Sequence, residues 1–177
     1  KKNRKNVFES AYLSCYPKVM EEAEAVEQRL GASAYKELRE QALARGYFCH
    51  GEYIHHNILV AGGQMAVINF EKFALDVQAN DLYLFLRKIL EKQNYDFHLG
   101  SRIVSAYEQV RPLDPREKEY LSIRMQYPEK FWKLANYYYN TNKAWIPGKH
   151  MEKLEKFLSQ REKRVSFSRE ILYNNSN

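Results

Sequence analysis

The sequence is poor in cysteine and has no long apolar run. Its 177 residues include two cysteines, Cys15 and Cys49, which is too few for a disulfide scaffold and gives no zinc-knuckle spacing. No apolar stretch approaches the ~20 residues that a helix needs to cross a bilayer, and the basic start of the chain leads into no signal peptide. We therefore expect two reduced, buried thiols and no membrane partner.

The sequence also has only a modest excess of positive over negative residues, and no long run of one sign. Lys and Arg number 28 against 22 Asp and Glu, a net charge of +6, and basic residues alternate with acids, as at residues 152–156. Such alternation is typical of a solvated helical face, so we expect no nucleic-acid partner. Hydrophobic residues make up 45% of the chain and charged residues 28%, which excludes a disordered chain and indicates a globular domain with an apolar core.

Apolar residues recur at spacings of three and four along most of the chain, and this period predicts helices. Pro17 begins one predicted helix, Gly31 ends it, and Ser33 caps the next. Asp114 caps another, with Glu117 at the capping-box position. The predicted helices cover residues 7–14, 17–30, 34–44, 80–90, 99–110, 115–126, 128–138 and 149 to past 160, with a turn at 146–148 and a frayed tail at 174–177.

The helical period is interrupted between residues 47 and 73. Two short runs rich in β-branched residues, 58–60 and 65–68, flank the dipeptide Gly62-Gly63. Gly-Gly between two apolar runs is a β-hairpin signal. The fold class we predict is therefore mainly α with one small β-hairpin. A lone hairpin is only marginally stable and must pack on something, which makes this segment a reasonable place to look for a site.

Chemically versatile side chains gather just before the hairpin: His50, Glu52, His55, His56 and Asn57. The pair His50-x-Glu52 is typical of zinc deaminases, but these also need a downstream Pro-Cys-x-x-Cys that the sequence lacks. The pair Glu52-x-x-His55 has di-iron spacing, but that site needs a helix here and a second such pair. We expect His56 to be a loop residue without a role.

Phosphoryl transfer explains more of this segment. Protein kinases place His-x-Asp, then an Asn five positions after the Asp, ahead of a hairpin whose second strand ends at Asp-Phe-Gly. The Asp accepts the proton of the attacking hydroxyl, while the Asn and the strand-end Asp hold magnesium. This sequence has His50, Glu52 and Asn57 at that spacing, and Asn69-Phe70 follows the predicted hairpin.

Longer stretches of the chain resemble a known family. They are similar to the spore-coat kinase-like proteins of the CotS and YutH type, within the superfamily of aminoglycoside and choline phosphotransferases. The likeness runs from about residue 12 to residue 158. The stretches that carry it are 50–59 (HGEYIHHNIL), 67–73 (VINFEKF), 76–85 (DVQANDLYLF), 108–113 (EQVRPL) and 127–138 (YPEKFWKLANYY). In 76–85 the resemblance gives Asp81, at the start of a helix, a structural role.

The resemblance implies a fold, a location and partners. Residues 1–177 are expected to form the helical C-terminal lobe of a protein-kinase-like fold, without the N-terminal nucleotide-binding lobe. A protein of this kind would be made in the cytoplasm of the mother cell and deposited in the spore coat. Its implied partners are other coat proteins and its own N-terminal lobe.

Two positions depart from the family pattern. Glu52 stands where the superfamily has the proton-accepting Asp, and its additional methylene moves the carboxylate by roughly 1 Å, a displacement that can cost ~10²-fold in rate. Asn69 stands where a metal-binding Asp belongs, so Asn57 and Asn69 offer magnesium no carboxylate. We therefore expect a degenerate catalytic loop of His50, Glu52 and Asn57, with weakened metal positions at Asn57 and Asn69.

Two functions stay open from the sequence. The first is a structural or interaction component of the spore coat that turns nothing over and holds no cofactor in this chain. The second is a small-molecule phosphotransferase, in which the whole protein uses Mg-ATP, Glu52 acts as the base, and Asn57 and Asn69 bind the metal. Because the expected nucleotide-binding lobe is missing here, we expect the chain alone to have no useful affinity for ATP.

Overall fold

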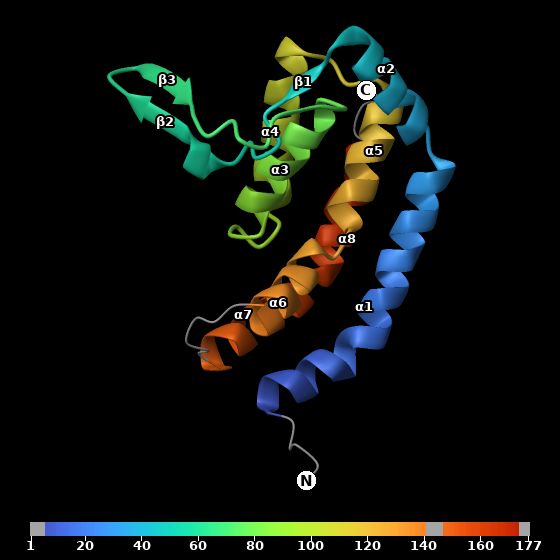
Figure 1. Cartoon of the computed structure of the whole chain (residues 1–177), viewed down its shortest axis with the longest axis vertical. Coiled ribbons are helices and arrows are strands. Elements are labelled where there is room, and N and C mark those ends of the chain that lie inside the picture. The colour runs from blue at the N-terminus through green and yellow to red at the C-terminus, as the bar shows by residue number, and fades with distance from the viewer. Residues whose placement is uncertain (1–5, 141–146, 174–177) are drawn as a thin grey trace.

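The computed structural model describes residues 6–140 and 147–173, and most of them are helical (Figure 1). The tail predicted at 174–177 lies outside the described residues. The helices are α1 (Val7–Ala32), α2 (Tyr35–Arg45), α3 (Ala79–Leu90), α4 (Phe97–Val110), α5 (Pro115–Gln126), α6 (Glu129–Asn140), α7 (Pro147–Ser159) and α8 (Arg161–Tyr173). The predicted fold class, mainly α with a small hairpin, is confirmed.

The predicted break at Pro17 is wrong, because α1 is continuous from Val7 to Ala32 with Pro17 inside it. Proline removes one backbone hydrogen bond from a helix. Here Tyr12 and Val19, on either side of Pro17, are both buried in one apolar cluster, and the Tyr12 ring stacks on Phe131 at 4.0 Å. Packing on both sides thus holds the helix together across the proline, and α1 bends in its N-terminal part (Figure 1).

The predicted stop at Gly31 is wrong, whereas the predicted cap at Ser33 is confirmed. Helix α1 runs through Gly31 to Ala32, and the amide of Ser33 donates to the Leu30 carbonyl at 3.2 Å. Helix α2 begins at Tyr35, whose backbone N–H donates to the hydroxyl oxygen of Ser33 at 3.3 Å. It ends at Gly46 as predicted, in the left-handed conformation (φ 66°) that favours glycine.

The single last helix predicted from 149 is two helices, α7 and α8, separated at Gln160. Gln160 is buried, and its side-chain amide donates to the carbonyl of Glu91 at 3.1 Å. The change of direction lets Phe157 of α7 and Phe167 of α8 enter two different apolar clusters. Of the predicted turn at 146–148, Ile146 lies outside the described residues and the other two begin α7.

The predicted hairpin is confirmed as β2 (Ile58–Ala61) and β3 (Gln64–Val67), paired antiparallel with Ile58 opposite Val67. Gly62 and Gly63 both have positive φ, 56° and 75°, as the tight turn between twisted strands requires. Two further short strands, β1 (Phe48–Cys49) and β4 (Ala74–Leu75), pair antiparallel with each other. In the sequence they lie before and after the hairpin. A 3-10 turn, η1 (His55–Asn57), leads into β2.

The core consists of two apolar clusters. One contains residues of α3, α5 and α8, with Tyr83, Leu86 and Leu121 fully buried. The other lies where α1, α6 and α7 meet and contains Phe8 and Phe131. The hairpin lies outside both clusters and projects from the helical body (Figure 1).

Both cysteines are free thiols, as predicted, but only Cys49 is buried. Cys15 is half-buried, because it packs at the edge of the second cluster rather than inside it. In the described part of the chain, no helix is both long enough and apolar enough to cross a bilayer.

Candidate functional site

The loop before the hairpin is anchored to the first turn of α3. The carboxylate of Asp81 accepts the backbone N–H groups of His50 at 2.6 Å and of Gly51 at 3.0 Å. Burial raises the pKa of Asp81, and the two N–H donors act in the opposite direction by favouring its ionised form. Asp81 therefore anchors the beginning of the loop to helix α3.

His50 links this loop to the end of β3. Its ring is buried and lies with Nε2 2.9 Å from the carbonyl oxygen of Ile68. Its Nδ1 accepts the amide of Glu52 at 3.1 Å, so Nε2 carries the proton and donates to Ile68. His50, predicted as part of the catalytic loop, is thus placed as a positioning residue for the neighbouring segments.

Gly51 allows the loop to touch the segment after β3. Its φ is +76°, and a Cβ at this position would lie 1.9 Å from the carbonyl oxygen of Lys72. Only glycine combines this backbone conformation with such a close approach. The loop and the segment around Lys72 are therefore in direct backbone contact.

The two predicted metal positions are brought together. Asn57 is buried, and its Nδ2 donates to the Glu52 carbonyl at 2.9 Å. Asn69, in the left-handed conformation with φ 66°, donates from Nδ2 to Oδ1 of Asn57 at 3.0 Å. The amide oxygen that a cation would use on Asn57 therefore already accepts a hydrogen bond from the other proposed ligand.

These residues do not fit a divalent cation as they stand. Magnesium at phosphate sites prefers one or two carboxylates together with water. Asn57 and Asn69 are neutral and bonded to each other. Among residues 6–140 and 147–173, no three His, Cys, Asp or Glu side chains gather as a metal site would require.

The predicted base Glu52 lies beside a cation. Its carboxylate is 40% exposed and forms an ion pair with Lys72 at 3.0 Å. The Lys72 ammonium thus occupies a carboxylate oxygen that a general base would use to accept a proton. Sequence reasoning missed Lys72, because no pattern marked it.

The two loop histidines differ in their surroundings. His56 is exposed, and its predicted lack of a role stays a prediction. His55 has its Nε2 2.8 Å from Nζ of Lys92, which follows α3. Burial, then Lys92, then His56 lower the pKa of His55. Lys92 was also missed by the sequence reasoning, whereas Asp81 was found by the resemblance as a structural acid.

An exposed aromatic cluster borders the loop on the side of β1 and β4. The ring of Phe48 lies 6.0 Å from Phe70 and 5.6 Å from Phe73, and all three side chains are exposed. Phe70 also contacts the His50 ring at 4.4 Å. The site therefore has an apolar face directly beside its polar loop.

Comparison with known proteins places this arrangement in a family. The model of the family described as spore coat putative kinase YutH matches residues 1–171. Spore coat protein S of Bacillus subtilis (strain 168) is 24% identical over 164 residues, which cover 92% of this chain and 47% of that protein.

A solved structure shares the fold. The crystal structure of an aminoglycoside phosphotransferase from Alicyclobacillus acidocaldarius subsp. acidocaldarius DSM 446 superposes with a TM-score of 0.83 at 24% identity. The match covers 97% of this chain and 51% of that one. The chain thus spans about half the length of the proteins it matches, and the kinase-like fold predicted from the sequence is confirmed.

Proposed function

The chain belongs to the YutH family of putative spore coat kinases, and on that premise we propose that the protein is a catalytically degenerate, kinase-like component of the bacterial endospore coat. The observation that carries the proposal is the hydrogen bond from Asn69 to Asn57, at the two positions where the kinase pattern binds metal. Two neutral amides, of which one already donates to the oxygen of the other, offer little to a hydrated divalent cation.

The surroundings of Glu52 support the same conclusion. Its carboxylate is partly exposed and paired with Lys72. A general base works when it is within hydrogen-bond reach of the reacting hydroxyl with its acceptor atoms available. A longer side chain than the usual aspartate, held by a lysine, is poorly suited to that task.

The location and partners follow from the family. The matching family and a curated relative are both described as spore coat proteins. We infer synthesis in the cytoplasm of the mother cell, followed by assembly with other coat proteins. The support for this part is the family alone.

A partner within the same protein is inferred from the aromatic face. Phe48, Phe70 and Phe73 form an exposed apolar cluster beside the loop. The chain spans about half of its relatives, so the other half of such a protein is available to cover this face. We propose that a nucleotide-lobe-like N-terminal half packs here and that residues 1–177 form the helical lobe.

Thermal unfolding of the whole protein with Mg-ATP tests the degeneracy. A ligand that binds only the folded state stabilises it by ~2.7 kcal/mol at 100 times its Kd. We expect no magnesium-dependent shift for the natural protein and a shift for Asn69→Asp combined with Glu52→Asp. The matched control is Asn94→Asp, which makes the same change at another left-handed asparagine.

The second candidate, an ATP-dependent small-molecule phosphotransferase, is favoured by one observation. The loop skeleton is intact, with Asp81 holding His50 and Gly51. A magnesium-dependent shift in the natural protein that disappears in Glu52→Ala would establish this alternative and reject the degenerate scaffold.

A further inference from the structure

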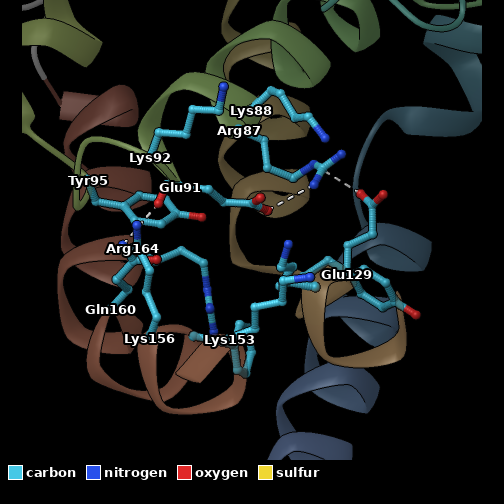
Figure 2. A pocket seen from close by; sticks show the side chains of 13 residues that line it. Arg87, Lys88, Glu91, Lys92, Tyr95, Glu129, Lys153, Lys156, Gln160 and Arg164 are labelled. Carbon is cyan, nitrogen blue, oxygen red and sulfur yellow. Dashed lines mark hydrogen bonds and ion pairs between the residues drawn. The ribbon is translucent and has the colours of Figure 1, made fainter. Parts of the chain in front are cut away.

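A basic cavity of about 230 Å³ lies away from the aromatic face, among α3, α6, α7 and the start of α8. Figure 2 shows Lys88 and Lys92 on one wall, Lys153 and Lys156 on the opposite wall, and Arg164 closing one side with Gln160. A volume of this size holds several waters or a small ligand, since one water occupies ~30 Å³ of liquid. It is too small for a folded partner.

Positive charge dominates the lining. Seven lysines and arginines line the cavity against two glutamates, Glu91 and Glu129. Arg87 forms an ion pair with each of them, with N···O distances of 2.8 Å to Glu91 and 3.2 Å to Glu129. Glu129 also pairs with Lys133 and accepts the hydroxyl of Tyr83 at 2.6 Å.

The lining lysines therefore lack a counter-charge. None of Lys88, Lys92, Lys130, Lys153 and Lys156 has an ion-pair partner within the described part of the chain. Burial lowers the pKa of Lys88 and Lys130, and neighbouring cations lower both further, although Glu91 acts in the opposite direction. A bound anion would relieve this repulsion.

A second observation points to a ligand independently of the lysines. Arg164 lines the cavity, is only 3% exposed, and stacks over the ring of Phe157 at 4.6 Å. Its Nε has no hydrogen-bond partner, and its charge partner Glu22 lies at 3.5 Å while also pairing with Arg161. A buried guanidinium with an unused donor is costly, and an oxyanion is its natural complement.

From these observations we propose that the cavity binds a small molecule with at least two negative charges, carried by phosphate or carboxylate groups. The site uses neither Glu52, Asn57 nor Asn69, so it stands whether or not the loop is catalytic. It borders that loop through Lys92, which contacts His55. A multivalent anion matches the several cations on facing walls better than a single charge does.

Titration calorimetry of the whole protein with pyrophosphate, at fixed ionic strength and near neutral pH, tests the proposal. Citrate and inorganic phosphate serve as further probes that separate phosphate from carboxylate ligands and multivalent from simple anions. The variant is Lys88→Gln with Lys153→Gln, which leaves the Arg87 ion pairs intact and removes like-charge repulsion. The matched control is Lys18→Gln with Lys36→Gln, two exposed helical lysines outside the cavity.

We expect one pyrophosphate per chain, at least ~10-fold weaker binding in the cavity variant, and a change within ~2-fold in the control. Tighter binding of citrate than of pyrophosphate supports the proposal with a carboxylate ligand. Equal losses in the two double variants would mean diffuse charge and overturn it, as would no binding of either multivalent probe. A DNA duplex that binds through Lys88 and Lys153 and that pyrophosphate does not displace would also overturn it.

Discussion

The carboxylate of Asp81 holds the backbone amide of His50 at 2.6 Å, joining the first turn of α3 to a loop 31 residues earlier in the chain. The same carboxylate holds the amide of Gly51. One acidic side chain thus sets the starting geometry of the whole loop that leads to Glu52 and Asn57.

Replacing Asp81 with Asn should destabilise the protein by about 1–3 kcal/mol. The amide keeps one acceptor oxygen but presents its NH₂ to the second backbone N–H, which is left without a partner. Urea unfolding followed by circular dichroism measures the change. The control is Asp96→Asn, because Asp96 caps α4 and asparagine caps helices equally well. Equal effects at the two positions would contradict the anchoring role of Asp81.

Adding a methyl group at Gly51 and at Gly31 should have opposite effects. Gly51→Ala forces a Cβ within 1.9 Å of the Lys72 carbonyl at positive φ, so the loop must move at a cost of at least ~1–3 kcal/mol. Gly31→Ala lies inside α1 with nothing within 4 Å and should stabilise by about 0.5–1 kcal/mol. The melting temperatures of the two variants, each compared with that of the natural protein, test this prediction. A shift of both in the same direction would contradict it.

Acid should weaken the fold through Glu129. Burial by itself would raise its pKa, but Arg87, Lys133 and Tyr83 outweigh burial and hold the pKa below the ordinary 4.5. The stabilisation is therefore complete above pH 4.5 and is lost as the pH falls through the lowered pKa.

The check is urea unfolding as a function of pH for the natural protein and Glu129→Gln. The gap in unfolding free energy between them should be widest near neutrality and should shrink as the pH falls below 4.5. Glu24→Gln, an exposed change in α1, should leave the pH profile unaltered. If the difference in unfolding free energy between the natural protein and Glu129→Gln did not change with pH, the charge of Glu129 would contribute nothing to stability.

The thiol of Cys49 should be inert in the folded protein. Burial, followed by the nearby charges of Asp81 and Asp76, raises its pKa to about 12. At mildly alkaline pH only roughly 10⁻⁴ of it is thiolate, the reactive form. In a Cys15→Ser background, a thiol-specific chromophore should label Cys49 at least ~100-fold faster in denaturant than in buffer. Equal rates would mean that β1 opens readily.

Features that depend on residues close together in the chain could be predicted from the sequence, because the pattern that indicates them lies within a few residues. The Gly62-Gly63 turn, the capping box of Asp114 with Glu117 and the spacing from Glu52 to Asn57 each depend on neighbouring residues, and the first two occur as predicted. The proximity of Asn57 and Asn69 followed from the hairpin length. Their direct amide bond could not be predicted, because it depends on the left-handed backbone at Asn69.

Features that depend on distant packing were missed. Whether Pro17 breaks a helix was decided by the Tyr12–Phe131 contact, 119 residues apart in the chain. The strand β4 has two residues, too few for a periodic pattern. The basic cavity gathers lysines from α3, α6 and α7 that along the sequence look like ordinary solvated faces.

The hairpin has a consequence for how Asn57 and Asn69 respond to a partner. Leu59, Val60 and Met65 are exposed on a two-stranded ribbon that projects from the body (Figure 1), so its amides should exchange with solvent far faster than those of α3. That ribbon is also the chain segment that connects the two asparagines. We therefore expect a protein that covers the ribbon to slow the exchange of its amides and to restrain the positions of Asn57 and Asn69.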